Sequence, residues 1–397
     1  MANVSSSNGL EKRPKLAFRR ADGSSFPSWS RTSLSSIIEP YSEKVYGEHK
    51  YEVLTSSREG LQRQVDHFGS EQRHDTDGYN VIPFGYCTYR NRSDDGRFAF
   101  NINTISSNAI VSKFYPVFRF TNANSLFMSE FLNSSSRAKK KLSVLAVGTS
   151  QVVLSFEALK AADFDLPCKD EQDKIASFFE CLNRRIEYQR TLVDALKKYK
   201  RGVLSVAFGK YGSICSWQTT PYPFAELASR RSEKYDPRSG EQMPCVELEH
   251  IEQETGRIIG SIPSTQQNSI KGVCKSGDTL FGKLRPYLRK YAFVKKDMVC
   301  SSEIWSLVPS ETIIPEYLFY LVQTDEFIKI ANISSGTKMP RAEWSNIEKS
   351  VFSVPNKEVQ AQIVQTLRGL DSRMLDAIDM LGELQLMKEG LLQQLFI

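Results

Sequence analysis

The chain has 397 residues, of which 40% are hydrophobic and 11% aromatic, which is enough to build ordinary cores and excludes a wholly disordered protein. At roughly 100–200 residues per domain, this length predicts two or three domains. Charged residues make up 25% and the net charge is +6, a mild basic excess that permits nucleic acid as a partner without requiring it.

Cysteine usage and the amino terminus bear on the compartment. The seven cysteines are an odd number, and no two lie within ten residues of each other, which disfavours a disulfide framework and a zinc cluster. The first 25 residues are polar and lack the apolar core of a signal peptide. No run approaches the ~18–20 apolar residues of a membrane span. These features predict a cytoplasmic protein with reduced thiols and no membrane partner.

Residues 1–25 are predicted to be an N-terminal tail, and residues 26–163 a first variable region. Aromatic and β-branched runs at 79–89 and 109–120, broken by turn residues, predict strands, and a helical patch is expected at 125–132. The mixture indicates an α+β domain. Its basic residues form a small set, Arg90, Arg92, Arg97, Lys113 and Arg119, of which Arg90, Arg92 and Arg97 are the candidate nucleic-acid contacts.

A helical region is predicted over 164–209. Asp170, Glu171 and Asp173 crowd the first turn, where the positive end of the helix dipole favours acidic side chains. Apolar residues follow in steps of four and three over about four heptads, with Gln189 and Lys200 at the missing places, which is typical of a coiled coil. Such a helix runs about 38 residues, or ~57 Å. The residues predicted to pair are Ile175, Phe179, Leu182, Ile186, Val193 and Leu196.

A second variable region is predicted over 210–350, with strands at 291–294 and 304–308 and a helical patch at 315–330. Between residues 271 and 296 eight basic residues and four aromatics are opposed by a single aspartate, which suits a surface that follows DNA phosphates, where arginines can also read guanine edges. The alternative, a solvated strand face, is the better interpretation for any single lysine here. The predicted DNA contacts in this cluster are Lys283, Arg285, Tyr287, Arg289 and Lys290.

A second helical region is predicted over 351–397, and it repeats the first. At an offset of 188 residues, 12 of the 45 positions in 164–208 are identical, and the same offset pairs Trp29 with Trp217. Two similar helices separated by a compact domain can pair antiparallel across a pseudo-two-fold axis; the alternative is two amphipathic helices that each pack on their own domain. The second set of pairing residues is Ile363, Leu367, Leu370, Met374, Leu381 and Leu384.

No catalytic group of residues emerges. The string from Gly277 to Lys283 resembles a phosphate-binding loop, but Leu284 replaces the hydroxyl that would hold magnesium. The four histidines are scattered. Glu247, Glu249, His250 and Glu252 form an acidic cluster that could bind a metal, although an exposed strand edge or loop is the simpler interpretation. The sequence therefore predicts a protein that is not itself an enzyme.

Several strings resemble the specificity (S) subunit of type I restriction–modification systems, and they occur in order along nearly the whole chain. These strings are PKLAF with FPSW, FGKLRPYLRKYAF at 281–293, SSEIW at 301–305, SSGTKMPRAEW at 334–344, and the helix starts LPCKDEQDKIA and VPNKEVQAQIV. Region one departs from the pattern, because its VGTSQVVLSFE lacks the Lys-Met-Pro-Arg core. Ser301, Ser302, Lys338 and Arg341 lie in the matching strings and complete the predicted DNA contacts.

The resemblance implies an α+β fold with two globular target recognition domains joined by two long antiparallel coiled-coil helices, a pseudo-two-fold internal repeat. It implies a non-catalytic subunit that reads a bipartite target on double-stranded DNA and docks two methyltransferase (M) subunits and restriction/translocase (R) subunits. S-adenosylmethionine, ATP and Mg²⁺ would then belong to those partners, with no cofactor in this chain. Two alternatives are a coiled-coil adaptor without DNA readout and a self-contained restriction or methylation enzyme with a degenerate site.

Overall fold

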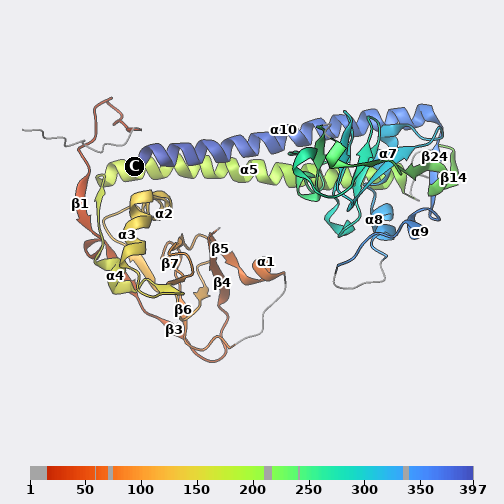
Figure 1. Cartoon of the computed structure of the whole chain (residues 1–397). Coiled ribbons are helices and arrows are strands. Elements are labelled where there is room, and N and C mark those ends of the chain that lie inside the picture. Colours follow the sequence, from red (N-terminus) through yellow and green to blue (C-terminus); the bar gives the residue numbers. More distant parts are fainter. Residues whose placement is uncertain are drawn as a thin grey trace, which may run out of the picture. The chain divides into compact units, whose positions relative to one another are not determined.

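The computed structural model describes residues 16–58, 60–69, 75–209, 217–239, 242–333 and 339–396. The chain divides into two compact units: unit 1 comprises residues 1–187 with 382–397, and unit 2 comprises 188–381. Two long helices, α5 (Lys169–Phe208) and α10 (Lys357–Leu395), each contribute residues to both units (Figure 1). Among the described residues, no helix combines the length and the apolar character needed to cross a bilayer.

The described part of unit 1 contains two larger sheets and two two-stranded sheets. The four-stranded sheet has the order β2-β11-β7-β9 and the five-stranded sheet the order β3-β6-β10-β4-β5, while β1 pairs with β13 and β8 with β12. The strands are β1 (Ser30–Ser33), β2 (Ile38–Tyr41), β3 (Lys44–Val45), β4 (Glu52–Ser57), β5 (Gly60–Arg63), β6 (Tyr79–Val81), β7 (Cys87–Tyr89), β8 (Arg92–Ser93), β9 (Phe100–Ile102), β10 (Ala109–Val111), β11 (Val117–Phe120), β12 (Val152–Val153) and β13 (Asp163–Leu166). The helices are α1 (Gln64–Phe68), α2 (Ser125–Ser134), α3 (Ser136–Leu145) and α4 (Phe156–Lys160).

Unit 2 repeats this plan. Its four-stranded sheet has the order β15-β23-β20-β21, its five-stranded sheet the order β16-β19-β22-β17-β18, and β14 pairs with β24. The strands are β14 (Thr219–Pro223), β15 (Ala228–Arg230), β16 (Lys234–Tyr235), β17 (Pro244–Val246), β18 (Ile262–Pro263), β19 (Lys271–Cys274), β20 (Thr279–Gly282), β21 (Tyr291–Phe293), β22 (Met298–Cys300), β23 (Ile304–Pro309) and β24 (Val351–Pro355). The helices are α6 (Phe224–Leu227), α7 (Pro315–Leu321), α8 (Asp325–Ala331) and α9 (Trp344–Ile347).

The strand orders of the two units correspond one to one, including the mixed character of the larger sheet. In unit 1 the one parallel pair of that sheet is β10 with β4, and in unit 2 it is β22 with β17 at the equivalent place. The α+β fold with two globular domains, an internal repeat and two long helices is therefore confirmed, although most of the residues in the variable regions differ between the copies.

Two boundaries differ from the sequence prediction. The helical regions were predicted from 164 and 351, but residues just before α5 and α10 form the closing strands β13 and β24, which pair with β1 and β14. The patch predicted as one helix at 315–330 is two helices, because Thr324 caps the second of them by accepting a hydrogen bond from the backbone N–H of Phe327.

Each domain core continues into the long helices. In unit 1 the ring of Phe127 on α2 packs edge-on against Phe396, with ring centroids 5.8 Å apart, and Phe179 of α5 joins the same buried cluster. In unit 2 Leu367 of α10 shares a cluster with Phe281. Burying one such side chain stabilises a fold by about 1.5–3 kcal/mol, so the helices are part of each domain rather than appended to it.

The helices run antiparallel within each unit. In unit 1 Ile175, near the start of α5, shares a cluster with Leu392 near the end of α10, and in unit 2 Leu204 shares one with Ile363 at the opposite ends. All twelve predicted pairing residues are buried or half-buried. The side chain of Gln189 donates to the carbonyl oxygen of Ala377 at 2.9 Å, and these residues are 188 apart. A residue that meets its own repeat equivalent is what a local two-fold axis requires.

In each unit a buried glutamine side chain links the start of the long helix to the domain through hydrogen bonds with backbone groups. Oε1 of Gln360 accepts from the backbone N–H of Ile314 at 2.9 Å, and Nε2 donates to the carbonyl of Pro355 at 2.9 Å. Gln172 makes the same two bonds in unit 1, with Asn124 and Pro167, both at 2.9 Å. The offset of 188 residues pairs Pro167 with Pro355 and Gln172 with Gln360, so the two units use the same hydrogen-bonding arrangement.

We expect Gln360→Ala to lower the stability of unit 2 by about 1–3 kcal/mol, because the change leaves buried backbone groups without their partners. The thermal unfolding transition measures the effect. Gln365→Ala, at an exposed position of the same helix, is the control, with an expected change within about 0.5 kcal/mol. Equal shifts in the two variants would contradict the fastening role.

Candidate nucleic-acid interface

The loop after β20 has an unusual backbone. Arg285 and Arg289 both have φ of 51°, the left-handed region, and between them Pro286–Leu288 form a single 3₁₀ turn. Each non-glycine residue in that region costs about 1–2 kcal/mol, so the surroundings must hold it in place. The backbone N–H of Arg285 donates to the carbonyl of Pro340 at 2.8 Å, and that of Gly282 to Lys290 at 2.8 Å. The loop is therefore fixed in one shape before any ligand arrives.

Three separate strings of the sequence meet at this loop. Leu284 forms an isolated bridge with Arg341, and the backbone N–H of Ala342 donates to Lys283 at 2.8 Å. The backbone N–H of Lys283 in turn donates to Glu303 at 2.9 Å. We name the result the loop-285 surface. Its side chains are Lys283, Arg285, Tyr287, Ser301, Ser302, Met339 and Arg341.

The cations of this surface differ in their availability. The guanidinium of Arg285 is exposed and makes no ion pair with any described residue, and Tyr287 is 50% exposed beside it. Arg341 is exposed but pairs with Glu303 at 3.2 Å. Lys338 lies outside the described residues. Arg285 and Tyr287 are thus the side chains best placed to reach an external ligand.

Two other predicted contacts have partners inside the domain. Arg289 donates to the carbonyl of Gln323 at 3.1 Å and forms ion pairs with Asp325 and, at 3.8 Å, with Glu254. Lys290 donates to the carbonyl of Leu248 at 2.6 Å. DNA contact by these two residues stays a prediction, but the geometry favours a role in holding the loop.

In the acidic cluster at 247–252, Glu247, His250 and Glu252 have partners within unit 2, while the side chain of Glu249 is 81% exposed. Lys271 donates to Glu247 at 2.7 Å, and the ring of His250 accepts from the backbone N–H of Glu247 at 3.0 Å. Burial pushes the pKa of Glu247 up, yet the hydrogen bonds and the charge of Lys271 bring the pKa to a net value below the ordinary one. Nowhere in the described part of the chain do three His, Cys, Asp or Glu side chains gather where they could hold a metal ion.

Unit 1 carries the equivalent loop, between β7 and β9, and the predicted contacts Arg90, Arg92 and Arg97 all lie on it. The backbone N–H of Leu154 donates to Asn91 at 2.9 Å, and Arg92 pairs with Val153. Leu154 and Val153 are the repeat equivalents of Ala342 and Arg341, which contact the loop of unit 2 in the same way. Arg90 and Arg92 are exposed, and Arg97 lies 3.9 Å from Asp95. The repeat thus places both basic sets at the same position of the same fold.

The sequence analysis missed one aromatic residue at this position. Phe114 is 54% exposed, and the guanidinium of Arg92 and the ammonium of Lys113 lie 5.4 and 5.8 Å from its ring centroid. A cation over an aromatic face is attracted by about 0.5–1 kcal/mol at an exposed site. The sequence does hold one indication of this residue, because Phe114 follows the basic residue Lys113 in a short turn.

Two copies of one α+β domain, each with a fixed basic loop at the same position, define a protein with two equivalent surfaces suited to a polyanion. The family described as "Type I restriction modification DNA specificity domain" matches residues 39–198 and 228–379. The chain therefore belongs to this family, and the two matched stretches correspond to the two repeats.

Individual relatives agree with this assignment. The type I restriction enzyme HindI specificity subunit of Haemophilus influenzae is 31% identical over 134 residues, which cover 32% of this chain and 28% of that protein's length. The type I restriction–modification S subunit of M. genitalium has the same fold, with a TM-score of 0.57 and 15% identity over 97% of this chain and 99% of that one. A chain from a study of complex assembly and conformational transition in the type I R-M system gives a TM-score of 0.53 and 14% identity over 93% and 98%.

Proposed function

We propose that the protein is the DNA-binding specificity subunit of a type I restriction–modification complex, in which each unit reads one half of a bipartite target on double-stranded DNA. The observation that carries the proposal is the pair of equivalent loops, each fixed by the same backbone bonds and each presenting exposed arginines. Arginine is suited to this task because it contacts phosphate and can also make paired hydrogen bonds with the edge of guanine.

The proposed partners are those that the resemblance to specificity subunits implies. Two methyltransferase subunits and restriction/translocase subunits would dock on the chain, in the cytoplasm, with the paired helices as the spacer between the two reading sites. The string from Gly277 to Lys283 runs through strand β20 and not into a helix, so it does not fit the phosphate-binding loop that it resembles. We propose that S-adenosylmethionine, ATP and Mg²⁺ are bound by the partner subunits and that this chain carries out no catalytic step.

Substitution of Arg285 tests the proposal. In the assembled complex, Arg285→Ala is expected to weaken binding to the target by about 1–3 kcal/mol if the side chain contacts a base. Arg285→Lys keeps the charge but cannot make the two parallel hydrogen bonds, so we expect it to retain non-specific binding and to lose discrimination at one base pair. Titration of labelled duplexes at several salt concentrations measures both effects.

Arg289→Ala is the matched comparison, since its ion pairs lie inside the domain. We expect it to lower the unfolding temperature and to leave the dependence of binding on salt unchanged. Unchanged isotherms for Arg285→Ala would remove the loop-285 surface from the interface. Loss of salt-dependent DNA binding in the assembled complex would favour the adaptor alternative. Methyl transfer or cleavage by the pure chain would favour the enzyme alternative.

A further inference from the structure

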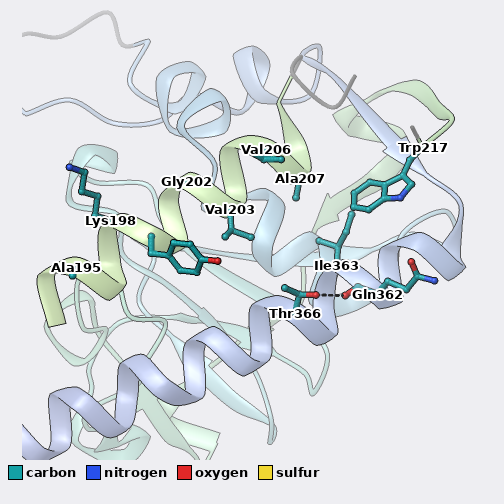
Figure 2. A pocket seen from close by; sticks show the side chains of 11 residues that line it. Ala195, Lys198, Gly202, Val203, Val206, Ala207, Trp217, Gln362, Ile363 and Thr366 are labelled. Atoms are coloured by element: carbon teal, nitrogen blue, oxygen red, sulfur yellow. Dashed lines mark hydrogen bonds between the residues drawn. The ribbon is translucent and has the colours of Figure 1, made fainter. Parts of the chain in front are cut away.

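An apolar groove of about 820 Å³ lies on unit 2 where the last turns of α5 meet the first turns of α10 (Figure 2). Val203 and Val206 of α5 face Ile363 of α10 across it, and Trp217 lies beyond them. Val206 is 39% exposed. Among the described residues that line the groove, Lys198 is the single charged side chain. An open apolar surface of this kind on a helix pair is typical of a binding site.

The internal repeat identifies the corresponding position in unit 1. Residues of the groove wall have equivalents 188 positions away, on the start of α5, on the end of α10 and just before β1. The related pairs are Lys174 and Gln362, Phe178 and Thr366, Gln394 and Val206, and Trp29 and Trp217.

In unit 1 a short segment of the chain itself covers this position. The backbone N–H of Leu16 donates to the carbonyl of Gln394 at 3.4 Å, and the ring of Phe18 meets Phe178 edge-on with centroids 5.7 Å apart. The ammonium of Lys174 donates to the backbone carbonyl of Arg19. Residues 16–19 thus show what the position accepts: a non-helical segment with apolar side chains two residues apart and a backbone carbonyl for one polar side chain.

Unit 2 has no such segment within its described residues, because the residues that the repeat places over the groove, 204–207, continue helix α5. Its walls nevertheless keep the same features. Trp217 stands in for Trp29, and the side-chain amide of Gln362 can donate to a backbone carbonyl as Lys174 does. Figure 2 shows that the hydroxyl of Thr366 bonds the backbone carbonyl of Gln362, at 3.1 Å, and not its side chain.

We infer that this groove receives an extended segment of a partner chain, with two apolar side chains two residues apart flanked by acidic residues. We expect the flanking residues to be acidic because Lys198 lines the groove, where the equivalent residue of unit 1 is the uncharged Leu386. The N-terminal segment of a second copy is the poorer match, since it would bring Arg19 and Arg20 beside Lys198. The inference adds a binding site to the proposed assembly with partner subunits. It depends on that proposed function only for which chain supplies the segment.

Binding of short labelled peptides to the full chain tests this inference. An acidic probe, Asp-Glu-Leu-Ala-Phe-Ser-Asp-Glu, is expected to bind saturably in fluorescence anisotropy, and more tightly than the basic probe Pro-Lys-Leu-Ala-Phe-Arg-Arg-Ala of residues 14–21. Val206→Glu places a charge in the groove and is expected to weaken the acidic probe at least about tenfold. Lys198→Ala is expected to reduce the preference for the acidic probe at low salt.

Gln394→Glu is the matched control, because it alters the equivalent position of the groove that residues 16–19 already cover; the affinity for the acidic probe is expected to stay within about twofold. Circular dichroism verifies that Val206→Glu folds, and Thr366→Lys gives a second way to obstruct the groove from the other helix.

Three results would each overturn the inference: no saturable binding, binding that survives both groove variants, or a basic probe that binds as tightly as the acidic one. The last result would identify a second copy as the occupant. This experiment does not measure DNA binding. Failure of the groove inference can therefore be distinguished from failure of the proposed function.

Discussion

Replacing residues 210–350 with the corresponding region of another specificity subunit is expected to change one half of the DNA target and to leave the other half intact. The exchanged region carries the whole loop-285 surface, and the backbone bonds that fix the loop come from Pro340, Ala342 and Glu303 within it. Specific sites are bound about 10³-fold or more tightly than non-specific DNA. The chimera should therefore lose about that factor on the original target and regain it on a hybrid target.

Selection from duplexes with both half-sites randomised, carried out on the assembled complex, measures this change. The reciprocal exchange of residues 26–163 is the control and should alter the other half alone. A chimera whose target changes in both halves at once would rule out independent reading by the two units.

The architecture was largely predictable because two periodicities are visible in the chain. The apolar stripe of the helices and the offset of 188 residues identified α5, α10 and the duplication. Strand order was not predictable, since the pairing of β10 with β4 joins residues far apart that carry no local signal. The loop geometry was hidden for a related reason. The left-handed backbone of Arg285 is held by the bond from its N–H to Pro340, and that of Arg289 by its carbonyl, which accepts from the N–H of Glu254; neither residue is a glycine.

The candidate interface was predictable in its location and not in its individual side chains. Counting basic residues at 271–296 located the loop, but charge alone cannot separate Arg285, which is exposed, from Arg289, whose partners Glu254 and Asp325 come from other segments. Phe114 was missed because only Lys113 is next to it in the sequence, while Arg92 of strand β8 is brought to its ring by the fold.

The structure also explains why two polar residues, Gln189 and Lys200, interrupt the apolar stripe of helix α5. Gln189 donates to its own repeat equivalent, Ala377. Lys200 is buried, with 5% of its side chain exposed and its ammonium 2.6 Å from the carboxylate of Asp371. The hydroxyl of Tyr320 donates to the same carboxylate at 2.8 Å. Burial lowers the pKa of Lys200 below its ordinary value, while the charge of Asp371 opposes that shift. Such a pair fixes the register of two helices.

Asp371→Ala is therefore expected to destabilise unit 2 by about 3–5 kcal/mol, because it leaves the buried ammonium of Lys200 without the carboxylate that it contacts. At about 2–4 °C per kcal/mol for a unit of this size, the unfolding temperature falls by about 6–20 °C. Replacing both partners, with Lys200→Met and Asp371→Leu, should recover most of the loss, since the apolar pair needs no desolvation of charge. Differential scanning calorimetry of the full chain measures all three proteins.

The repeat supplies the matched control for this pair. Lys388, the equivalent of Lys200, lies 2.8 Å from Glu130, but both side chains keep more than a fifth of their surface exposed, at 24% and 21%. Water screens that pair, so Glu130→Ala should cost about 1 kcal/mol or less. If Asp371→Ala proved as mild as Glu130→Ala, burial would not govern the strength of the interaction. If the double replacement were as damaging as Asp371→Ala alone, the loss would come from packing around the helices and not from an unpaired charge.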